Sequence, residues 1–382
     1  MVLDVIISAI LVVQSALFLP LNTLLFRIDT KASVFESGDD MYTVMWSTTL
    51  PGTGYITYEY NGEERTLYDE ENAAIRTKDT IHSVRVPKKE LDNNTYTCHS
   101  QQIGTKRAYV AVKGITVSSE PVEFRGYSGQ DEIHALLISD IHENPAPAEK
   151  AVRCFEEAPD LIVMNGDAVS LMTSAFKFKQ VLSYAYRFSG GSIPVIYTRG
   201  NHENRGEYGA EVVELFKTTT GGLYYTCSYG PAQFLCLDSG EDKPDDDWTY
   251  SGLVDSTSYI ARETEWMKVL ALEEAEYTVC FAHMPYLNNR YGFDWVEPLT
   301  DLGIDLFVGA HKHRINYEYN KDKAPFYQMI DGGKSGDDGY MATMLTFRDG
   351  EIYGKCFDDK GTMRGEHTYQ LSNAETLPLQ CE

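Results

Sequence analysis

The stretch Ile193-Pro194-Val195-Ile196-Tyr197-Thr198-Arg199-Gly200-Asn201-His202-Glu203 joins a run of apolar, β-prone residues to an uncommon polar string. Four other polar clusters follow runs of the same kind. They are Asp140-Ile141-His142 after Ile133–Ile138, Gly166-Asp167 after Leu161–Met164, His283 after Tyr277–Phe281, and Gly309-Ala310-His311-Lys312-His313 after Ile304–Val308. Short runs rich in Val, Ile, Leu, Phe and Tyr predict buried strands, so each cluster is expected at the end of a strand.

Strands that open into polar turns place the side chains of those turns together at one edge of a sheet, where α/β proteins gather their ligands. Carboxylates, imidazoles and amide oxygens are groups that bind divalent metal ions. The five clusters therefore predict one pocket at a sheet edge of an α/β domain. Its composition is that of a two-metal hydrolase site.

Taken singly, the clusters differ in how specific they are. An Asp-x-His or a Gly-Asp pair is weak, because these residues also cap helices and form turns, as Gly38-Asp39 is expected to do. His283 alone is typical of an ordinary structural histidine. The string Gly200-Asn201-His202-Glu203 is far more specific, and His311 and His313 alternate in a way that presents two imidazoles to neighbouring ions. The order of all five raises the joint interpretation well above any single one.

In this order the clusters resemble the signature of the calcineurin-like metallophosphoesterase superfamily, which is D-x-H, G-D, G-N-H-[DE], H and G-H-x-H. The resemblance covers about Glu132–Asp358, and the departure within the motifs is Ala310, which stands between Gly309 and His311. It implies a four-layer αββα sandwich. The runs that fit its second sheet are Phe326–Ile330, Tyr340–Phe347 and Glu351–Phe357.

The resemblance also implies roles for these residues, position by position. One ion would be held by Asp140, His142, Asp167 and His313, and the other by Asp167, Asn201, His283 and His311. Two divalent ions, Mn, Fe or Zn, would share Asp167 as a bridge and activate a bridging hydroxide that attacks phosphorus. His202 is implied as the general acid or as a clamp on a phosphate oxygen, with Glu203 orienting it. Arg199 is expected to bind substrate phosphate, and a structural ion pair is its alternative.

The region before the motifs has a different pattern. Its strand-like segments are Met41–Ser47, Tyr55–Tyr60, Ile81–Val86, Thr95–Gln101 and Ala108–Val112. Pro51-Gly52-Thr53-Gly54 is interpreted as a turn between the first two. This spacing predicts an all-β sandwich over residues 28–125. Tyr96 and the residues before it resemble the tyrosine corner of immunoglobulin-like and fibronectin type III domains, and Trp46 is a candidate core aromatic. Ordinary core aromatics of another sandwich are the alternative.

A sandwich in front of these motifs is similar to the purple acid phosphatase branch, which carries a fibronectin-like N-terminal domain. Two positions depart from that branch. Ser170 stands where it has a metal-binding tyrosine, and His142 stands where it has glycine or a similar residue. Without the tyrosinate there is no strong ligand for ferric iron. The site therefore resembles the histidine-containing form used with Mn, Fe(II) or Zn.

Residues 1–27 form a hydrophobic N-terminal segment, and from Val5 to Phe26 it contains no charged residue. Its length approaches the roughly 20 apolar residues that cross a bilayer, so residues 2–26 predict association with a membrane. A removed signal peptide is a less favoured alternative, because Asp4 precedes the apolar run in place of a basic region. A docking helix on a soluble protein is the other alternative. The side of the membrane is left open, and so are a secreted and a cytoplasmic location.

The formal net charge of the 382-residue chain is -24. Binding a nucleic acid by its backbone needs clustered Lys and Arg, so no nucleic-acid partner is expected. A small phosphorylated substrate is compatible with this charge, because bound metal ions reverse the local potential. The oligomeric state is not determined by these patterns.

The function that follows is a metal-dependent phosphoric ester hydrolase. A phosphomonoesterase of acid-phosphatase type is placed ahead of a phosphodiesterase of the same superfamily. A non-catalytic metal-binding interaction protein is the rival from another class, since fold does not fix function. The expected domain boundaries are 1–27 for the hydrophobic segment, 28–125 for the sandwich and 130–370 for the metallophosphoesterase domain.

Overall fold

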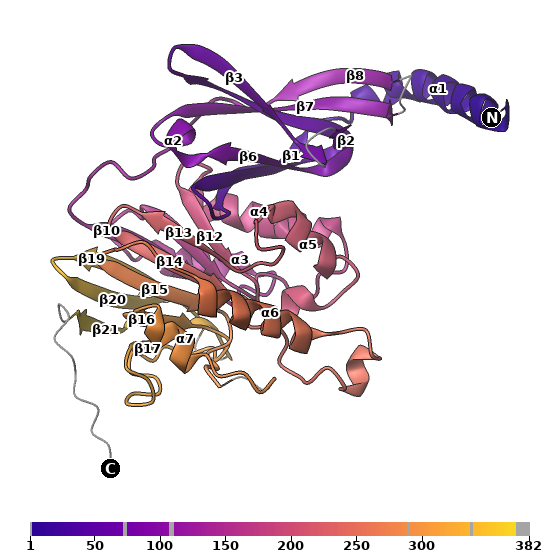
Figure 1. Cartoon of the computed structure of the whole chain (residues 1–382). Helices are drawn as coiled ribbons and strands as arrows, with labels where there is room; N and C mark the ends of the chain where they lie inside the picture. Colours follow the sequence, from indigo (N-terminus) through magenta and orange to yellow (C-terminus); the bar gives the residue numbers. More distant parts are fainter. Residues whose placement is uncertain (1, 72–74, 107–110, 289–290, 337–338, 372–382) are drawn as a thin grey trace. The chain divides into compact units, whose positions relative to one another are not determined.

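The structure is a computed structural model that describes residues 2–71, 75–106, 111–288, 291–336 and 339–371 (Figure 1). The chain divides into two compact units. The first comprises Met1–Ser128, Ala168–Tyr197 and His202–Cys227, and the second comprises Gly129–Asp167, Thr198–Asn201 and Ser228–Glu382. Each unit is thus assembled from three separate segments of the chain, whereas the expected domains are continuous blocks.

The chain begins with the helix α1 (Val2–Thr23). Within the described residues, no helix combines the length and the hydropathy that a membrane span requires. The helix is linked to a strand of the same unit, because the hydroxyls of Ser15 and Thr105 lie 2.5 Å apart. Association with a membrane through residues 2–26 stays a prediction.

The strands after α1 form a β-sandwich. They are β1 (Ile28–Glu36), β2 (Met41–Tyr60), β3 (Glu63–Tyr68), β4 (Glu70–Glu71), β5 (Ile75–Arg76), β6 (Asp79–Pro87), β7 (Thr95–Lys106), β8 (Ala111–Ser118) and β9 (Val122–Glu123), with the short helix α2 (Lys88–Leu91) between β6 and β7. Their core includes Val34, Trp46, Ile56 and Tyr96, all fully buried. The predicted all-β class is confirmed, whereas the fibronectin type III assignment stays a prediction. Of the predicted strand Ala108–Val112, residues 108–110 lie outside the described part of the chain.

The long strand β2 belongs to both halves of the sandwich. Its first half pairs antiparallel with β1 and β6, and its second half pairs with β3 and β7. The turn predicted at Pro51–Gly54 is therefore wrong, because this segment continues the strand through an irregular register. Gly52 and Gly54 are needed for close packing: a Cβ on Gly52 would lie 2.8 Å from the Gln101 carbonyl oxygen. Strands that pass between sheets commonly do so through such bends.

The tyrosine corner predicted at Tyr96 is not formed. A corner tyrosine bonds the backbone a few residues upstream, whereas the Tyr96 hydroxyl donates to the Gly191 carbonyl oxygen, 95 residues away, at 2.9 Å. Tyr96 therefore holds a distant segment of the first unit against the sandwich. Trp46 is fully buried in the core, as expected for a core aromatic.

The rest of the first unit packs on the strand β1. It includes α4 (Ala175–Ser189), β12 (Pro194–Thr198) and α5 (Gly209–Phe216). β12 pairs in parallel with β1. Phe35 of β1 meets Phe216 of α5 edge to face at 5.3 Å between ring centroids, and Phe178 of α4 lies 6.1 Å from Phe216. Tyr197 of β12 stacks on Phe216 with 4.9 Å between the ring centroids, so these rings form an aromatic core of the first unit.

The second unit contains two sheets. The first has β10 (Ile133–Ile138), β11 (Leu161–Asn165), β18 (Gly333–Ser335), β19 (Gly339–Arg348), β20 (Glu351–Asp358) and β21 (Met363–Gln370). The second has β14 (Ala232–Leu237), β15 (Tyr277–Ala282), β16 (Leu306–Gly309) and β17 (Tyr327–Ile330), all parallel. Only Ser228 and Tyr229 of β13 (Tyr225–Tyr229) belong to this unit. Facing side chains join the sheets, because Phe347 of β19 meets Phe234 and Tyr277 edge to face.

Helices cover the outer faces of both sheets. α3 (Pro145–Val152) packs on β19 and β20. On the other side, Glu263 of α6 (Ser256–Val269) accepts the Asp238 N–H at the end of β14. α7 (Val296–Asp301) follows Trp295, whose ring nitrogen donates to Thr264 of α6. This order, helix, sheet, sheet, helix, confirms the predicted four-layer αββα sandwich.

The five predicted strands exist, within one or two residues, as β10, β11, β12, β15 and β16. The expectation that their turns meet at the edge of one sheet is wrong. β10 and β11 belong to one sheet of the second unit, and β15 and β16 belong to the other. An apolar run identifies a buried strand but does not name its partner, since pairing depends on the tertiary fold.

Tyr96→Phe removes the hydroxyl and leaves the buried Gly191 carbonyl without this donor. We expect the free energy of unfolding to fall by about 1–3 kcal/mol, the usual cost of an unsatisfied buried group. Urea unfolding followed by tryptophan fluorescence measures this change. Tyr60→Phe is the control, because the Tyr60 side chain is partly exposed, and its effect should stay within about 0.5 kcal/mol. Equal effects of both variants would contradict the anchoring role of Tyr96.

Candidate metal centre

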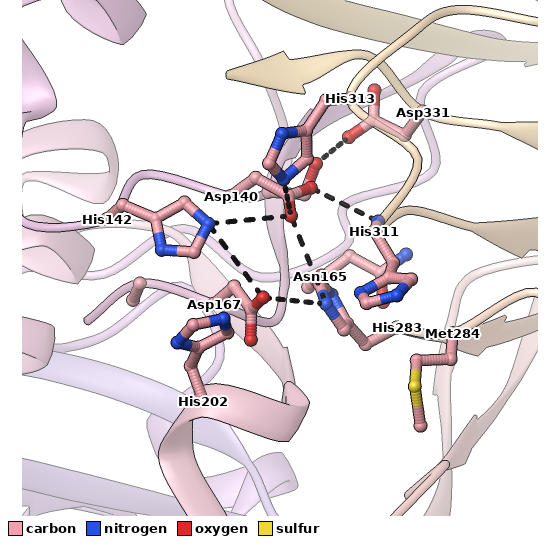
Figure 2. A network of polar contacts seen from close by, with 12 residues as sticks. Asp140, His142, Asn165, Asp167, His202, His283, Met284, His311, His313 and Asp331 are labelled. Atoms are coloured by element: carbon pink, nitrogen blue, oxygen red, sulfur yellow. Dashed lines mark hydrogen bonds and ion pairs between the residues drawn. The ribbon is translucent and has the colours of Figure 1, made fainter. Parts of the chain in front are cut away.

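The structure brings the six expected aspartate and histidine ligands together at the carboxyl ends of strands from two sheets (Figure 2), and the seventh expected ligand, Asn201, belongs to the same unit. They stand in the turns directly after the strands: Asp140 and His142 after β10, Asp167 after β11, His283 after β15, His311 and His313 after β16, and Asn201 after β12. All seven belong to the second unit. The carboxylates form the buried floor, because Asp140 is 0% and Asp167 1% exposed. The side chain of His313, by contrast, is 40% exposed.

Five of these residues have a left-handed backbone. The φ angles are 50° at Asp140, 44° at His142, 56° at Asp167, 64° at His311 and 52° at His313. Such angles are uncommon for residues other than glycine, and they cost energy unless the surrounding structure imposes them. Their concentration in three turns indicates that the turns are held to aim side chains. Backbone strain of this kind is typical of functional sites.

Among the residues of the second unit, the carboxylates and imidazoles form two groups, and the ligand atoms of each group lie within 4.8 Å of one another. One group is Asp140, His142 and His313, and the other is Asp167, His283 and His311. The first group lacks Asp167 and the second lacks Asn201 of the ligand sets that the resemblance implies, so the assignment of ligands to two ions stays a prediction. Asp167 also lies next to the first group, because its Oδ2 is 3.9 Å from His142 Nε2. A carboxylate in that position is suited to bridge two cations.

Close contacts lie within each group and also between the two groups. His313 Nε2 lies 3.1 Å from Asp140 Oδ1, and His283 Nε2 lies 3.1 Å from Asp167 Oδ2 (Figure 2). His283 Nε2 is also 3.9 Å from Asp140 Oδ1. The second oxygen of Asp140 accepts the backbone N–H of His311 at 3.2 Å. Asp140 is therefore held by the turn that supplies the two histidines.

The backbone carbonyl of Asn165 selects the tautomer of His283. It lies 2.7 Å from His283 Nδ1 and can only accept, so Nδ1 carries the proton. In the neutral form of the ring, Nε2 therefore carries the lone pair that can bind a metal ion. This atom faces the two aspartates. A bond from the second ring nitrogen to a carbonyl is the usual way in which proteins orient a metal-binding histidine.

Two glycines leave room for these side chains. Gly166 has a φ of 80°, and a Cβ there would lie 2.5 Å from His283 Nδ1. A Cβ on Gly309 would lie 2.4 Å from Pro285 Cβ, so the chain needs glycine at the end of β16. Ala310, the departure from the family motif, is fully buried, and its N–H donates to the His283 carbonyl oxygen at 2.7 Å. Gly309, which is one residue further from His311 than in the family motif, is therefore needed for close packing against Pro285. His311 and His313 still lie in the two ligand groups.

The two buried carboxylates dominate the electrostatics. Burial by itself lowers the pKa of His283, but the charges of Asp167 and Asp140 outweigh it and raise this pKa to about 10. Burial and the neighbouring His283 lower the pKa of His311 to about 4. The hydrogen bond that the His313 ring donates to the Asp140 carboxylate raises the pKa of His313. The floor of the site thus attracts positive charge strongly, and bound cations satisfy that attraction as protons do.

The residues fit a pair of divalent ions. Within the described residues, both amide atoms of Asn201 are buried and make no hydrogen bond, and Asp140 Oδ1 and His283 Nε2 are buried beside only the charged groups of this site. Buried polar atoms without a partner cost free energy, so a native protein rarely leaves several of them together. A carboxylate oxygen, an imidazole nitrogen and an amide oxygen are metal ligands. The orphaned atoms belong to the same residues that the sequence predicts as ligands.

The loop that carries Asn201 is anchored on both sides. Before it, Thr198 donates to Asn165 Oδ1 at 2.6 Å. Arg199 contacts Asp238 through two nitrogens, Nε at 2.8 Å and Nη2 at 2.6 Å. Asp238 is fully buried, and Arg199 is 7% exposed. The structural ion pair, the alternative for Arg199, is therefore present, and substrate binding by Arg199 stays a prediction.

His202 and Glu203 follow in the short helix η1 (Asn201–Asn204) and belong to the first unit. The Ser170 carbonyl lies 2.8 Å from His202 Nδ1, which must therefore carry the proton. Glu203 is fully buried, and its Oε1 accepts the N–H groups of Ala168 and Val169, directly after Asp167. Glu203 thus fixes the backbone behind Asp167. Its predicted role of orienting His202 stays a prediction.

Sequence reasoning missed the residues that support the ligands. Asn165 joins three segments, through His283, Thr198 and the Val308 carbonyl. Asp331 accepts from Ser139, the residue before Asp140, at 2.9 Å. Burial raises the pKa of Asp331 to about 6. Neither residue belongs to a motif. Their one sequence signal is that each polar side chain directly ends, or directly follows, an apolar run.

Residues 133–314 match the family described as calcineurin-like phosphoesterase, and all the expected ligands lie within this range. A comparison with curated protein sequences gave no significant match. Residues 133–314 are accordingly a domain of the calcineurin-like phosphoesterase family.

Solved structures with similar chain traces include PhoD, with a TM-score of 0.48 and 9% identity over 89% of this chain and 88% of that one. A dimetal phosphatase from Danio rerio has a TM-score of 0.44 and 11% identity, over 63% and 99%. A serine/threonine phosphatase from Saccharomyces cerevisiae has a TM-score of 0.31 and 14% identity, over 66% and 83%. Likenesses at these TM-scores carry no conclusion about function.

Gly166→Ala tests whether this glycine makes room for His283. Gly221 has a similar φ of 72° with nothing within 4 Å, so Gly221→Ala is the matched control. Both variants acquire left-handed strain of about 1–2 kcal/mol, but only the first displaces His283. We expect Gly166→Ala to lower the melting temperature clearly more, as measured by differential scanning calorimetry. Equal melting temperatures would show that the turn tolerates a side chain.

Proposed function

We propose that this protein is a phosphoesterase that depends on two divalent metal ions and acts first of all on phosphomonoesters. The observation that carries the proposal is the pair of ligand groups, Asp140, His142 and His313 beside Asp167, His283 and His311. Membership of residues 133–314 in the calcineurin-like phosphoesterase family supports the reaction class.

The chain's residues would share the work as follows. Asp140, His142 and His313 hold one ion, Asn201, His283 and His311 hold the other, and Asp167 contacts both. When bound, two such ions supply Lewis acidity and lower the pKa of water enough to make it a nucleophile at neutral pH. The buried carboxylates keep the histidines oriented, and the Asn165 carbonyl keeps Nε2 of His283 available. No side chain of the protein has to serve as a nucleophile.

The donor set favours certain metals. Mg²⁺ and Ca²⁺ prefer sites made of oxygen ligands alone. Structural zinc sites commonly use cysteine, and no cysteine takes part in either ligand group of the described residues. A mixture of imidazole nitrogen with carboxylate and amide oxygen suits Mn, Fe(II) or Zn. We take these three as the candidate ions.

His202 is the proposed general acid for the leaving oxygen. It follows the ligand Asn201 directly in the chain, and the Ser170 carbonyl holds its Nδ1. Nε2 is then the atom that would exchange a proton, and Arg205 Nη1 lies 3.3 Å from it. Arg199 and Glu203, whose contacts fix the loop and the backbone after Asp167, would act mainly by positioning.

Two alternatives stay open within this proposal. A phosphodiesterase would use the same ligands, since the difference lies in the surrounding loops. A non-catalytic metal-binding protein would bind the metal ions but would not hydrolyse phosphate esters. The presence of all seven ligand residues together with His202 favours an enzyme.

Metal removal and ligand substitution test the mechanism. We expect the full chain, stripped of metal by a chelator, to lose hydrolysis of p-nitrophenyl phosphate and to regain it with Mn, Fe(II) or Zn. Asp167→Ala and Asn201→Ala should abolish the restored activity, because each removes a ligand. Asp301→Ala is the control, since Asp301 is an exposed carboxylate on α7.

Three results separate the alternatives. Near-normal turnover of Asp167→Ala would end the two-ion mechanism. Faster hydrolysis of bis(p-nitrophenyl) phosphate than of the monoester would favour a phosphodiesterase. Two tightly bound ions without turnover of either ester would favour the binding role.

The dependence on the leaving group tests His202. We expect His202→Ala to lower kcat about 10²–10⁴-fold for phenyl phosphate, whose leaving oxygen needs a proton, the usual range for general acid catalysis. The loss should be much smaller for p-nitrophenyl phosphate, whose leaving group departs as an anion. Steady-state kinetics with both esters measure this difference. Equal losses would indicate a phosphate clamp and rule out the acid.

A further inference from the structure

A lysine and a tyrosine lie beside the ligand groups and have no role in the proposed hydrolysis. Lys312 stands in the turn after β16, between His311 and His313. Tyr286 lies three residues after His283. The Lys312 ammonium donates to the Tyr286 hydroxyl and lies 4.5 Å from the centroid of its ring. Both residues are partly exposed, so the pair reaches solvent.

The pair is close to one ligand group. The Tyr286 ring meets the His311 ring edge to face, with 6.1 Å between the centroids. His311 in turn belongs to the group formed with Asp167 and His283. The Tyr286 ring thus lies between the Lys312 ammonium and the His311 ring. Lys312 is not one of the expected metal ligands but lies near one of them.

The charge of Lys312 is not neutralised by a carboxylate. Among the described residues no Asp or Glu forms an ion pair with Lys312, although the formal net charge of the chain is -24. Other cations do have such partners: Lys217 contacts Asp69 at 2.8 Å, and Lys321 contacts Glu318 at 2.6 Å. An ammonium has three donors, and a neutral phenol occupies one of them. Lys312 therefore keeps both charge and donors for an anion.

We propose that Lys312 and Tyr286 form a subsite for a second anionic group of the substrate, a phosphate or a carboxylate. The inference rests on the proposed function, in which the ions between Asp140, Asp167 and the histidines hold the phosphate to be cleaved. Because Lys312 lies outside that shell, it meets an anion a few bonds away from the scissile phosphate. The Tyr286 hydroxyl holds the flexible lysine in place, which reduces the entropy that binding would otherwise cost.

The substrate class follows from this arrangement. It comprises phosphate esters or anhydrides that carry a second negative charge near the scissile group. A phosphate ester with a neutral leaving group would use the metal centre alone. The lysine would then discriminate between substrates by their charge, as a fixed positive group at a binding site does.

Binding of two matched probes tests the subsite without relying on turnover. Phosphonopropionate carries a phosphonate and a carboxylate, whereas propylphosphonate has a methyl group in place of the carboxylate. We would titrate both into the Mn-loaded full chain by isothermal calorimetry, with blank titrations into Mn-containing buffer. The variants are Lys312→Gln, Tyr286→Phe and the control Lys321→Gln, whose lysine is exposed and paired with Glu318.

We expect Lys312→Gln to weaken phosphonopropionate about 10-fold, the usual scale for a charge-assisted hydrogen bond. Propylphosphonate should change less than about 2-fold, because its phosphonate meets only the ions. Tyr286→Phe should cause a smaller loss of the same selectivity, and Lys321→Gln none. The Mn stoichiometry of each variant shows whether the ligands beside residue 312 are intact.

Three outcomes would overturn the subsite. Equal weakening of both probes would place Lys312 on the scissile phosphate, and no weakening would leave it without a role in binding. Equal affinity of the native protein for both probes would show that no second anion is recognised. This binding test is independent of hydrolysis. If the protein hydrolyses neither ester class, the proposed function fails, but native protein that prefers phosphonopropionate and a Lys312→Gln variant that loses this preference would still support the subsite.

Discussion

The second unit depends on one constraint, the burial of two carboxylates, Asp140 and Asp167, among imidazoles at the ends of strands from two sheets. Buried carboxylates are unstable unless positive charge compensates them. The raised pKa of His283 shows how strongly the two carboxylates attract positive charge, and among the described residues the amide atoms of Asn201 are buried without a hydrogen bond. The αββα sandwich supplies the position, since the carboxyl ends of β10, β11, β15 and β16 bring the turns of both sheets together. Metal binding and the stability of these turns should therefore be closely coupled.

Residues that are not themselves expected metal ligands hold these strained turns in place. Asn165 ties β11 to β16 and to the Asn201 loop, Asp331 holds Ser139, and Glu203 holds the backbone after Asp167. Left-handed φ angles at five ligands need such support, because none of these residues is glycine. The supporting residues are as buried as the ligands. Rigidity of this kind suits a site in which small displacements of ligands change the chemistry.

Two positively charged residues near the site, Arg199 and Lys312, differ in their contacts. Arg199 forms an ion pair with the buried Asp238, and this ion pair holds the loop that carries Asn201. Lys312, in contrast, meets only a phenol among the described residues, which leaves its charge available to a ligand. The proposed function requires a strongly acidic chain to concentrate positive potential locally. Bound metal ions and Lys312 would supply that potential without altering the net charge of the chain.

The sequence alone determined the five strands that carry the motifs, the class of fold and the candidate ligands, because apolar runs and the polar residues that end them are local features. It also identified the sandwich and the buried Trp46. Only the tertiary structure decided that the motifs come from two sheets, that β2 runs through both halves of the sandwich, and that Tyr96 bonds Gly191. It alone revealed Asn165 and Asp331 as supports and Lys312 as a partner of Tyr286. The physical reason is that strand pairing and buried hydrogen bonds join residues far apart in the chain, and local periodicity does not encode these partners.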